Sequence, residues 1–298
     1  ALGGALQMPH EPANLNLDLA LIGEAFVVVV VGGMGSVFGA FVAAVLIAMV
    51  KAFCIGAGSI DLFGTSFPLS KLTLVAEFLV MAVVLIWRPW GLFGKPQAVV
   101  RGAAAIEAPL RPLPVVWKRW GLVVLAALLL VPLLQGPAPY AVVLMIDLLI
   151  AVLFAASLHF LMGPAGMHSF GHAAYFGLGA YGAALCLKAL ALPMEAALVL
   201  APLLAAFGAL LFGWFCVRLS GVYLAMLTLA FAQIVWSVVF QWDDLTGGSN
   251  GLVGIWPAPW LASKPAYYLV TLLFTVAGCG LLARMLHAPL GLALRAGR

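Results

Sequence analysis

The residues best suited to chemistry in this sequence lie between Gly163 and Gly182, in the stretch GPAGMHSFGHAAYFGLGAYG. Six glycines occur there together with two histidines, one serine and two tyrosines, inside an otherwise apolar chain. Polar groups and loosened backbone at membrane depth are tolerated where protein buries them or where they line a water-filled path, and transporters hold small solutes with discontinuous helices. We therefore expect this stretch to line a solute pathway, with close packing of small residues four apart as the alternative.

Two further stretches extend this candidate site. The run LTLAFAQ places a threonine and a glutamine inside an apolar segment, where they either contact a solute or hold helices together. The loop 241–264 contains TGGSNG, which is typical of a solvated turn or of a nest of backbone donors. The predicted pathway residues are Gly166, Ser169, Phe170, Gly171, His172, Tyr175, Gly177, Thr228 and Gln233, and the predicted loop residues are Thr246, Gly247, Gly248, Ser249 and Asn250.

Other kinds of chemistry find little support. His168 and His172 are four residues apart and could share a helix face, but no third ligand accompanies them, so we expect no metal site. The sequence has no GxxxxGK[ST] phosphate loop and no nucleophile paired with a base, so we predict neither an enzyme nor a bound cofactor. Asp147 and Glu77 are acids inside apolar runs, and each is either a functional group or a paired group within the bundle.

The composition defines the class of protein that must position these residues. Hydrophobic residues make up 65% of the 298 residues and charged residues 8%, and the mean hydropathy is +1.19. Long apolar runs without period-two alternation predict an all-α, polytopic membrane bundle with glycine-broken helices. The net charge of +4 lies at the ends of apolar runs and gives no basis for nucleic-acid binding.

The apolar runs predict the helices. Residues 19–31 are too short to cross about 30 Å of hydrocarbon, and we expect Gly32, Gly33 and Gly35 to break the chain there into a helical hairpin. One kinked helix is the alternative. The predicted apolar segments are 19–31, 37–55, 72–87, 121–135, 140–162, 173–192, 196–217, 222–240 and 267–286.

Residues 96–119 differ from the rest and predict a basic, proline-containing linker. Six of the 14 Lys and Arg residues lie between Arg88 and Arg119, which predicts a cytoplasmic connection. The resulting orientation leaves four cations outside, at Lys51, Lys71, Lys188 and Lys264. The chain opens without Met in what looks like the end of a helix, so we expect a piece of a longer protein.

Three motifs in order, GPAGMHSFGHAAYFGLGAY, VRLSGVYLAMLTLAFAQI and LTGGSNGLVGI, resemble the M-type permease of the branched-chain amino-acid ABC importers. Upstream, AFVVVVVGGMGSVFGAFVAAVLIAMVKA and WRPWGLFGK are similar to the C-terminal part of its sister, the H-type permease. The resemblance implies that residues 1–95 are the C-terminal part of an H-type permease and that 96–119 are a linker. Residues 120–298 would then be the N-terminal and central part of an M-type permease.

The same resemblance implies a multi-pass permease of the bacterial inner membrane that imports branched-chain amino acids or related small amides. Its implied partners are ATPase subunits that bind the ATP, a periplasmic substrate-binding protein, membrane lipid and a second permease copy. In the family, the region matching HAPLGLALRAGR begins the coupling helix, so Leu292, Leu294 and Arg295 are the expected ATPase contacts. Because only its beginning is present, we expect this piece to enter membranes without supporting uptake. The alternative is an ion-coupled secondary transporter or channel that uses Asp147 or Glu77.

Overall fold

The computed structural model describes residues 17–62, 65–68, 73–95, 114–136, 139–217 and 219–296. Most of the predicted linker, 96–113, lies outside the described residues. The chain divides into two compact units. The first consists of Ala1–Ala98 and Leu229–Gln241, and the second of Val99–Thr228 and Trp242–Arg298.

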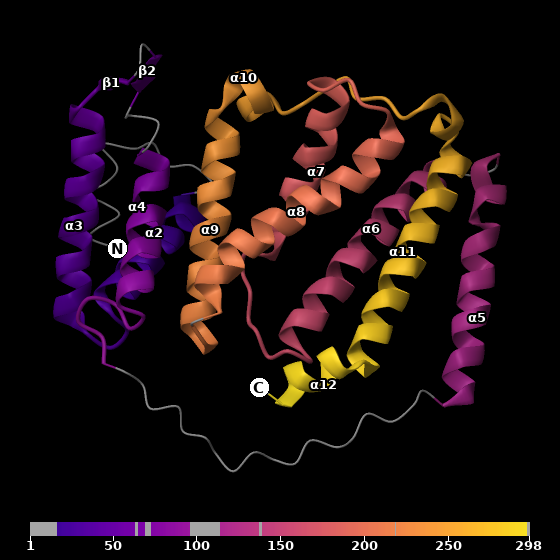
Figure 1. Ribbon diagram of the computed structural model, residues 1–298, viewed down its shortest axis with the longest axis horizontal. Coiled ribbons are helices and arrows are strands. Elements are labelled where there is room, and N and C mark those ends of the chain that lie inside the picture. The colour runs from indigo at the N-terminus through magenta and orange to yellow at the C-terminus, as the bar shows by residue number, and fades with distance from the viewer. Residues whose placement is uncertain are drawn as a thin grey trace. The chain divides into compact units, whose positions relative to one another are not determined.

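Three packed helices form most of the first unit: α2 (Leu17–Gly32), α3 (Val37–Gly56) and α4 (Thr73–Trp87) (Figure 1). A short antiparallel hairpin of β1 (Ser59–Leu62) and β2 (Thr65–Pro68) connects α3 to α4, with Ser59 opposite Pro68. Apolar side chains from all three helices fill the unit, and those buried most completely are Val27, Val30, Val31, Ala43, Met81 and Leu85.

The sequence GGMGS makes the turn between α2 and α3, so the two predicted segments are separate helices. Gly33 and Gly35 have φ angles of +101° and +89°, which favour glycine because a Cβ is strained there. Ser36 caps α3 by accepting a hydrogen bond of 3.0 Å from the backbone N–H of Gly39. The turn at residues 33–36 therefore ends one helix and starts the next.

The segment that follows α4, RPWGLFG, packs onto this turn. The backbone N–H groups of Leu92 and Phe93 donate to the carbonyls of Val31 and Gly32 over 2.8 and 3.0 Å. A side chain at Gly33 would overlap the backbone of the same segment. The GGMGS and WRPWGLFGK motifs thus form one joint that fastens the ends of α2 and α4 together.

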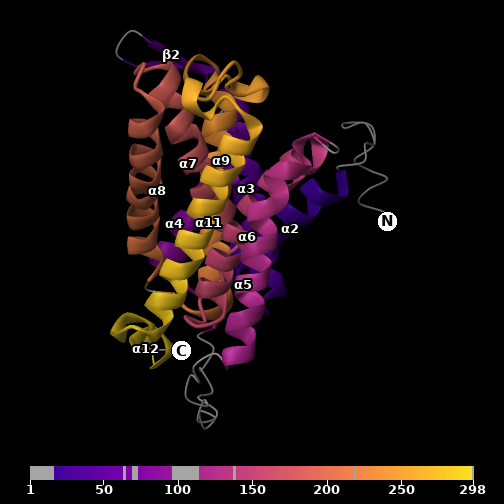
Figure 2. The ribbon, with the colours of Figure 1, turned by 90° about the vertical axis from the view of Figure 1, so that its right-hand side faces the viewer.

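The second unit is a helical bundle in which α6 packs against α11 and α7 against α8 (Figures 1 and 2). The Tyr268 hydroxyl, on a fully buried side chain of α11, donates to the Leu128 carbonyl of α5 over 2.8 Å and so ties α5 to this pair. The elements are α5 (Val115–Leu130), η2 (Val131–Gln135), α6 (Pro139–Met162), α7 (His172–Lys188), α8 (Met194–Cys216), α9 (Gly221–Gln241), α10 (Asp243–Thr246), η3 (Gly248–Asn250), η4 (Pro259–Leu261), α11 (Lys264–His287) and α12 (Pro289–Ala296). Helix α9 contributes its first part to this unit and its second part to the other.

The prediction of an all-helical membrane protein is confirmed, apart from the short β-hairpin. Within the described ranges, six helices are long and apolar enough to cross a membrane: Val37–Gly56, Val115–Leu133, Tyr140–Met162, Met194–Cys216, Gly221–Gln241 and Lys264–His287. The main difference concerns residues 115–119, which belong to the predicted linker and instead form the first turns of α5. Lys118 and Arg119 do not interrupt a helix, and the helix starts directly after Pro114.

Candidate functional site

Five elements of the second unit, α6, α7, α8, η4 and α11, line a partly open cavity of about 630 Å³. Its wall is mostly apolar, and the described residues that line it include no Asp, Glu, Lys or Arg. The side chains with polar groups in the wall are Ser157, His172, Tyr175, Tyr267, Thr271 and Thr275. The cavity is therefore suited to a small solute that is largely apolar or carries no net charge.

The central polar contact in the wall joins α6 to the start of α7. Ser157 Oγ donates to the Phe154 carbonyl over 2.7 Å and lies 2.7 Å from His172 Nε2. Because a serine hydroxyl has one proton, the tautomer of His172 decides which of the two groups donates in this contact. The other ring nitrogen of His172, Nδ1, is buried without a hydrogen-bond partner among the described residues. The Phe154 ring packs 5.1 Å from the imidazole and helps to hold it in place.

The glycine-rich stretch is divided between a loop and a helix. Residues 163–171 are irregular, and Gly166 has a φ of +64°. The backbone N–H of Phe170 donates to Thr228 Oγ1 over 3.1 Å, while the phenyl ring of Phe170 is exposed. A Cβ at Gly171 would overlap the Thr228 carbonyl oxygen. This close approach to α9 places the start of α7, and hence His172, beside the cavity.

The predicted pathway residues are therefore in different environments. His172 and Tyr175 line the cavity. Thr228 is buried and donates its hydroxyl proton to the Ala225 carbonyl, so it supports the loop before α7. Ser169 and Gly177 are partly buried and lie outside the cavity wall. Gln233 is also partly buried and outside the wall, and it lies in the part of α9 that belongs to the first unit.

Sequence reasoning missed the polar groups that α6 and α11 contribute to the cavity. Ser157, Thr271 and Thr275 are single hydroxyl residues in apolar runs, which is the same signal that identified Thr228. Thr271 and Thr275 donate to the carbonyls four residues earlier over 2.9 Å. Their hydroxyl protons are thus used within α11, which leaves oxygen lone pairs as their remaining hydrogen-bonding capacity.

The TGGSNG segment forms a compact turn after α10. Thr246 is buried, and its hydroxyl donates to the Trp242 carbonyl over 2.7 Å. Gly247 is left-handed, with a φ of +74°. The N–H of Gly248 is directed at Thr246 Oγ1, over 3.4 Å. The side chains of the last two predicted loop residues, Ser249 and Asn250, are exposed.

The residues predicted to contact an ATPase lie on the short helix α12, which follows α11. Gly291 packs against the last carbonyls of α11, because a side chain there would overlap the Leu286 carbonyl oxygen. Leu292 is exposed, while Leu294 and Arg295 are partly buried. Of the three predicted contact residues, only Leu292 is therefore exposed.

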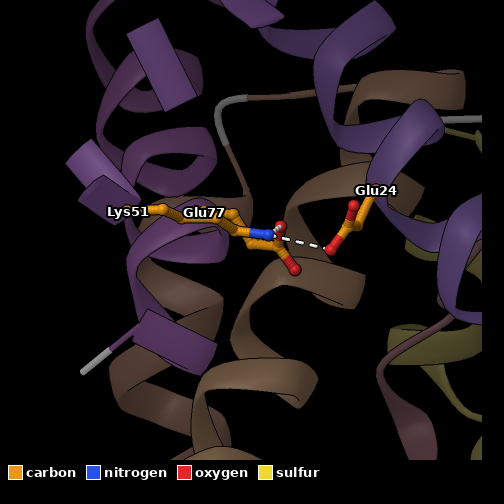
Figure 3. A network of polar contacts seen from close by, with 3 residues as sticks. All are labelled: Glu24, Lys51 and Glu77. Carbon is orange, nitrogen blue, oxygen red and sulfur yellow. Dashed lines mark hydrogen bonds and ion pairs between the residues drawn. The ribbon is translucent and has the colours of Figure 1, made fainter. Parts of the chain in front are cut away.

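A charged cluster lies within the first unit, where Lys51 of α3 bridges two carboxylates (Figure 3). Its Nζ is 2.8 Å from Glu24 Oε1 on α2 and 2.7 Å from Glu77 Oε2 on α4. The cluster has two acids for one base, and it connects α2, α3 and α4. Of the two acids noted in the sequence, Glu77 is thus paired, whereas Asp147 is exposed on α6 and lies outside the cavity wall.

Comparisons with known proteins give concordant results. Residues 140–298 match the family described as the permease component of the branched-chain amino acid transport system. The high-affinity branched-chain amino acid transport system permease proteins LivM of Escherichia coli (strain K12) and Salmonella typhimurium (strain LT2) are each 30% identical over 178 residues. These alignments cover 50% of this chain and 42% of each relative, so the chain spans less than half the length of these curated relatives. No solved structure matches.

Proposed function

Because this chain belongs to the branched-chain amino acid transport permease family, we propose that it is a permease component of an ABC importer for branched-chain amino acids or related small amides. Membership places it among multi-pass membrane transporters and not among enzymes. The proposed location of the protein is the bacterial inner membrane. Solute passes through the second unit, which contains most of the matched region.

The observation that carries this proposal is the cavity between α6, α7, α8 and α11. Its volume of about 630 Å³ is ample for a small amino acid. Apolar wall residues such as Leu153 and Phe274 offer contact to a branched aliphatic side chain. Ser157 and His172 supply a polar pair that can hydrogen-bond the polar end of the solute. The described wall residues include no Asp, Glu, Lys or Arg, and such a wall suits a solute without net charge.

Energy for transport comes from separate ATPase subunits, and a periplasmic binding protein delivers the solute. The absence of a phosphate-loop motif in the 298 residues supports a division of labour of this kind. We assign the ATPase contact to α12, with Leu292, Leu294 and Arg295 as contact residues, because a short amphipathic segment with a cation suits a groove on a partner. A second permease copy completes the membrane part.

We further propose that two permease types are joined in this chain. Residues 1–95 would be the C-terminal part of an H-type permease, 96–119 the cytoplasmic linker, and 120–298 part of an M-type permease. The family match to residues 140–298 supports the permease assignment of the second part.

The test is to fill the cavity from one side of α8. Ala205 lines the cavity, whereas its neighbour Ala206 is exposed and lies outside the wall. The variants A205F and A206F are made in a version of the chain that is extended at both ends and supports uptake, expressed with the ATPase and binding-protein subunits, and assayed for ATP-dependent uptake of radiolabelled leucine. We expect A205F to lose most uptake and A206F to retain it at equal membrane abundance. Unchanged uptake by a well-expressed A205F would refute the assignment of the cavity to the pathway.

A further inference from the structure

The segment between α10 and α11 has an unusual composition for a loop. No charged residue occurs in the 19 positions from Leu245 to Ser263, which lie between Asp244 and Lys264. A loop that extends into water normally carries charges, since these are favourably hydrated. The second half of this segment, LVGIWPAPWLA, instead contains two tryptophans and several aliphatic residues.

These apolar side chains are not buried. Trp256 is 84% exposed and Val253 70% exposed, and Ile255 and Trp260 are exposed as well. Residues 251–258 are irregular, so their backbone N–H and C=O groups have no regular helical or strand partners. The segment therefore combines apolar side chains that need shelter from water with a backbone that needs hydrogen bonds.

The segment is also fixed to the ends of neighbouring helices. The backbone N–H of Ala258 is 3.3 Å from Met194 Sδ, and Trp260 Nε1 donates to Glu195 Oε1 over 2.6 Å, both at the start of α8. Leu261 is buried and precedes α11 directly. Figure 1 shows the connection from α10 to α11 running across the end of the bundle at which α11 begins. Its exposed residues are thus held at the level where the apolar surfaces of α8 and α11 start.

We propose that residues 252–261 form an interfacial membrane anchor whose exposed Trp and aliphatic side chains insert into the headgroup layer of the bilayer. This level satisfies both needs of the segment, because apolar rings enter the acyl boundary while water remains available to the backbone. The helices that this segment joins or contacts, α8 and α11, also carry exposed apolar side chains, including Val199 and Leu273, which would face lipid once the helices cross the membrane. A phospholipid surface is therefore the occupant, in preference to a soluble protein.

Spin labelling in nanodiscs tests this assignment. The four native cysteines of the full chain are replaced by alanine, and single cysteines are introduced as W256C and V253C. The matched control is S249C, an exposed polar position of the same loop. Power saturation then compares the access of membrane-soluble oxygen and of a water-soluble nickel chelate to each nitroxide label.

We expect the ratio of oxygen to nickel access to be several-fold higher at positions 253 and 256 than at position 249. Equal ratios at the three positions, or nickel access dominating at 256, would overturn the proposal and indicate a surface for water or a soluble partner. A second measurement uses the chain with its native cysteines and follows tryptophan fluorescence. Brominated phospholipids should quench a smaller fraction of the tryptophan fluorescence in W256F than in the unmodified chain. An identical quenched fraction in the two proteins would also count against insertion.

Discussion

Replacing Lys51 by methionine should destabilise the first unit more than removing either of its acidic partners. The lysine is the only base among the described residues of the cluster, and it lies within 2.8 Å of one carboxylate and 2.7 Å of the other. The Glu77 side chain is only 10% exposed, whereas that of Glu24 is 48% exposed. K51M keeps most of the length of the side chain but leaves Glu77 buried without its cation.

The expected magnitudes follow from these exposures. Removing one partner of a buried ion pair costs about 3 to 5 kcal/mol, because the remaining charge is desolvated without compensation. E24Q removes the more exposed acid and leaves a neutral pair, so its cost should be about 1 kcal/mol or less. The double variant K51M/E77Q removes both buried charges, and it should recover most of the stability that K51M loses.

The assay uses a cysteine that the fold already supplies. Cys54 is buried on α3, in the same unit as the cluster, so it becomes reactive when that unit unfolds. With the other three cysteines changed to alanine, a dye that fluoresces on reaction with thiols reports the unfolding temperature in detergent. The expected order is K51M lowest, then the double variant, with E24Q close to the unmodified chain.

The reasoning is refuted if K51M unfolds at the temperature of the parent chain, or if E77Q fails to rescue it. The same variants bear on transport. A carrier coupled to an ion through Glu77 would lose uptake in the double variant, whereas a permease driven by ATPase subunits should retain ATP-dependent uptake at matched abundance. Uptake that is lost in K51M/E77Q despite recovered stability would favour ion coupling.

Two pairs of glycine variants test the close backbone contacts with the same dye, read at the buried Cys54 for the first unit and at the buried Cys216 for the second. G33A and G35A both place a Cβ at positive φ, at a cost of about 1 to 2 kcal/mol each. G33A should unfold at the lower temperature, because its Cβ also overlaps backbone atoms. Equal unfolding temperatures would contradict the proposed packing of the GGMGS turn against the WRPWGLFGK segment. G171A should be destabilised by overlap with the Thr228 carbonyl. G177A has open space in a helix and should gain up to about 1 kcal/mol; a stable G171A would disprove the contact.

The positions of the helices could be predicted from the sequence because membrane insertion depends on local composition. Each predicted apolar segment overlaps a helix, and the α6 and α8 segments agree with the structure to within two residues at either end. The start of α5 is not predicted, because Lys118 and Arg119 have the composition of a linker. Charge indicates where a chain leaves the hydrocarbon, but it does not determine where the helical backbone begins.

The composition of the cavity wall could not be predicted, because it depends on which helices pack together. Ser157 and His172 are 15 residues apart in sequence, and the hydroxyls of α11 are about a hundred residues further on. Polar residues within apolar runs can be recognised from sequence, but their partners require the pairing of α6 with α11 and of α7 with α8. Thr228 illustrates the limit, since its hydroxyl holds a loop in place and does not line the cavity.

The ion cluster changes how the charges of the chain bear on its orientation in the membrane. The sequence count placed Lys51 among the four cations outside, yet its ammonium group is held between two carboxylates within a helical unit. Topology responds to cations in loops and at helix ends, so a lysine paired inside a bundle should contribute little. Without Lys51, the outward side retains three cations, and the predicted bias toward a cytoplasmic linker becomes stronger. Intramembrane charges of this kind are thus better interpreted through their partners than through their sign.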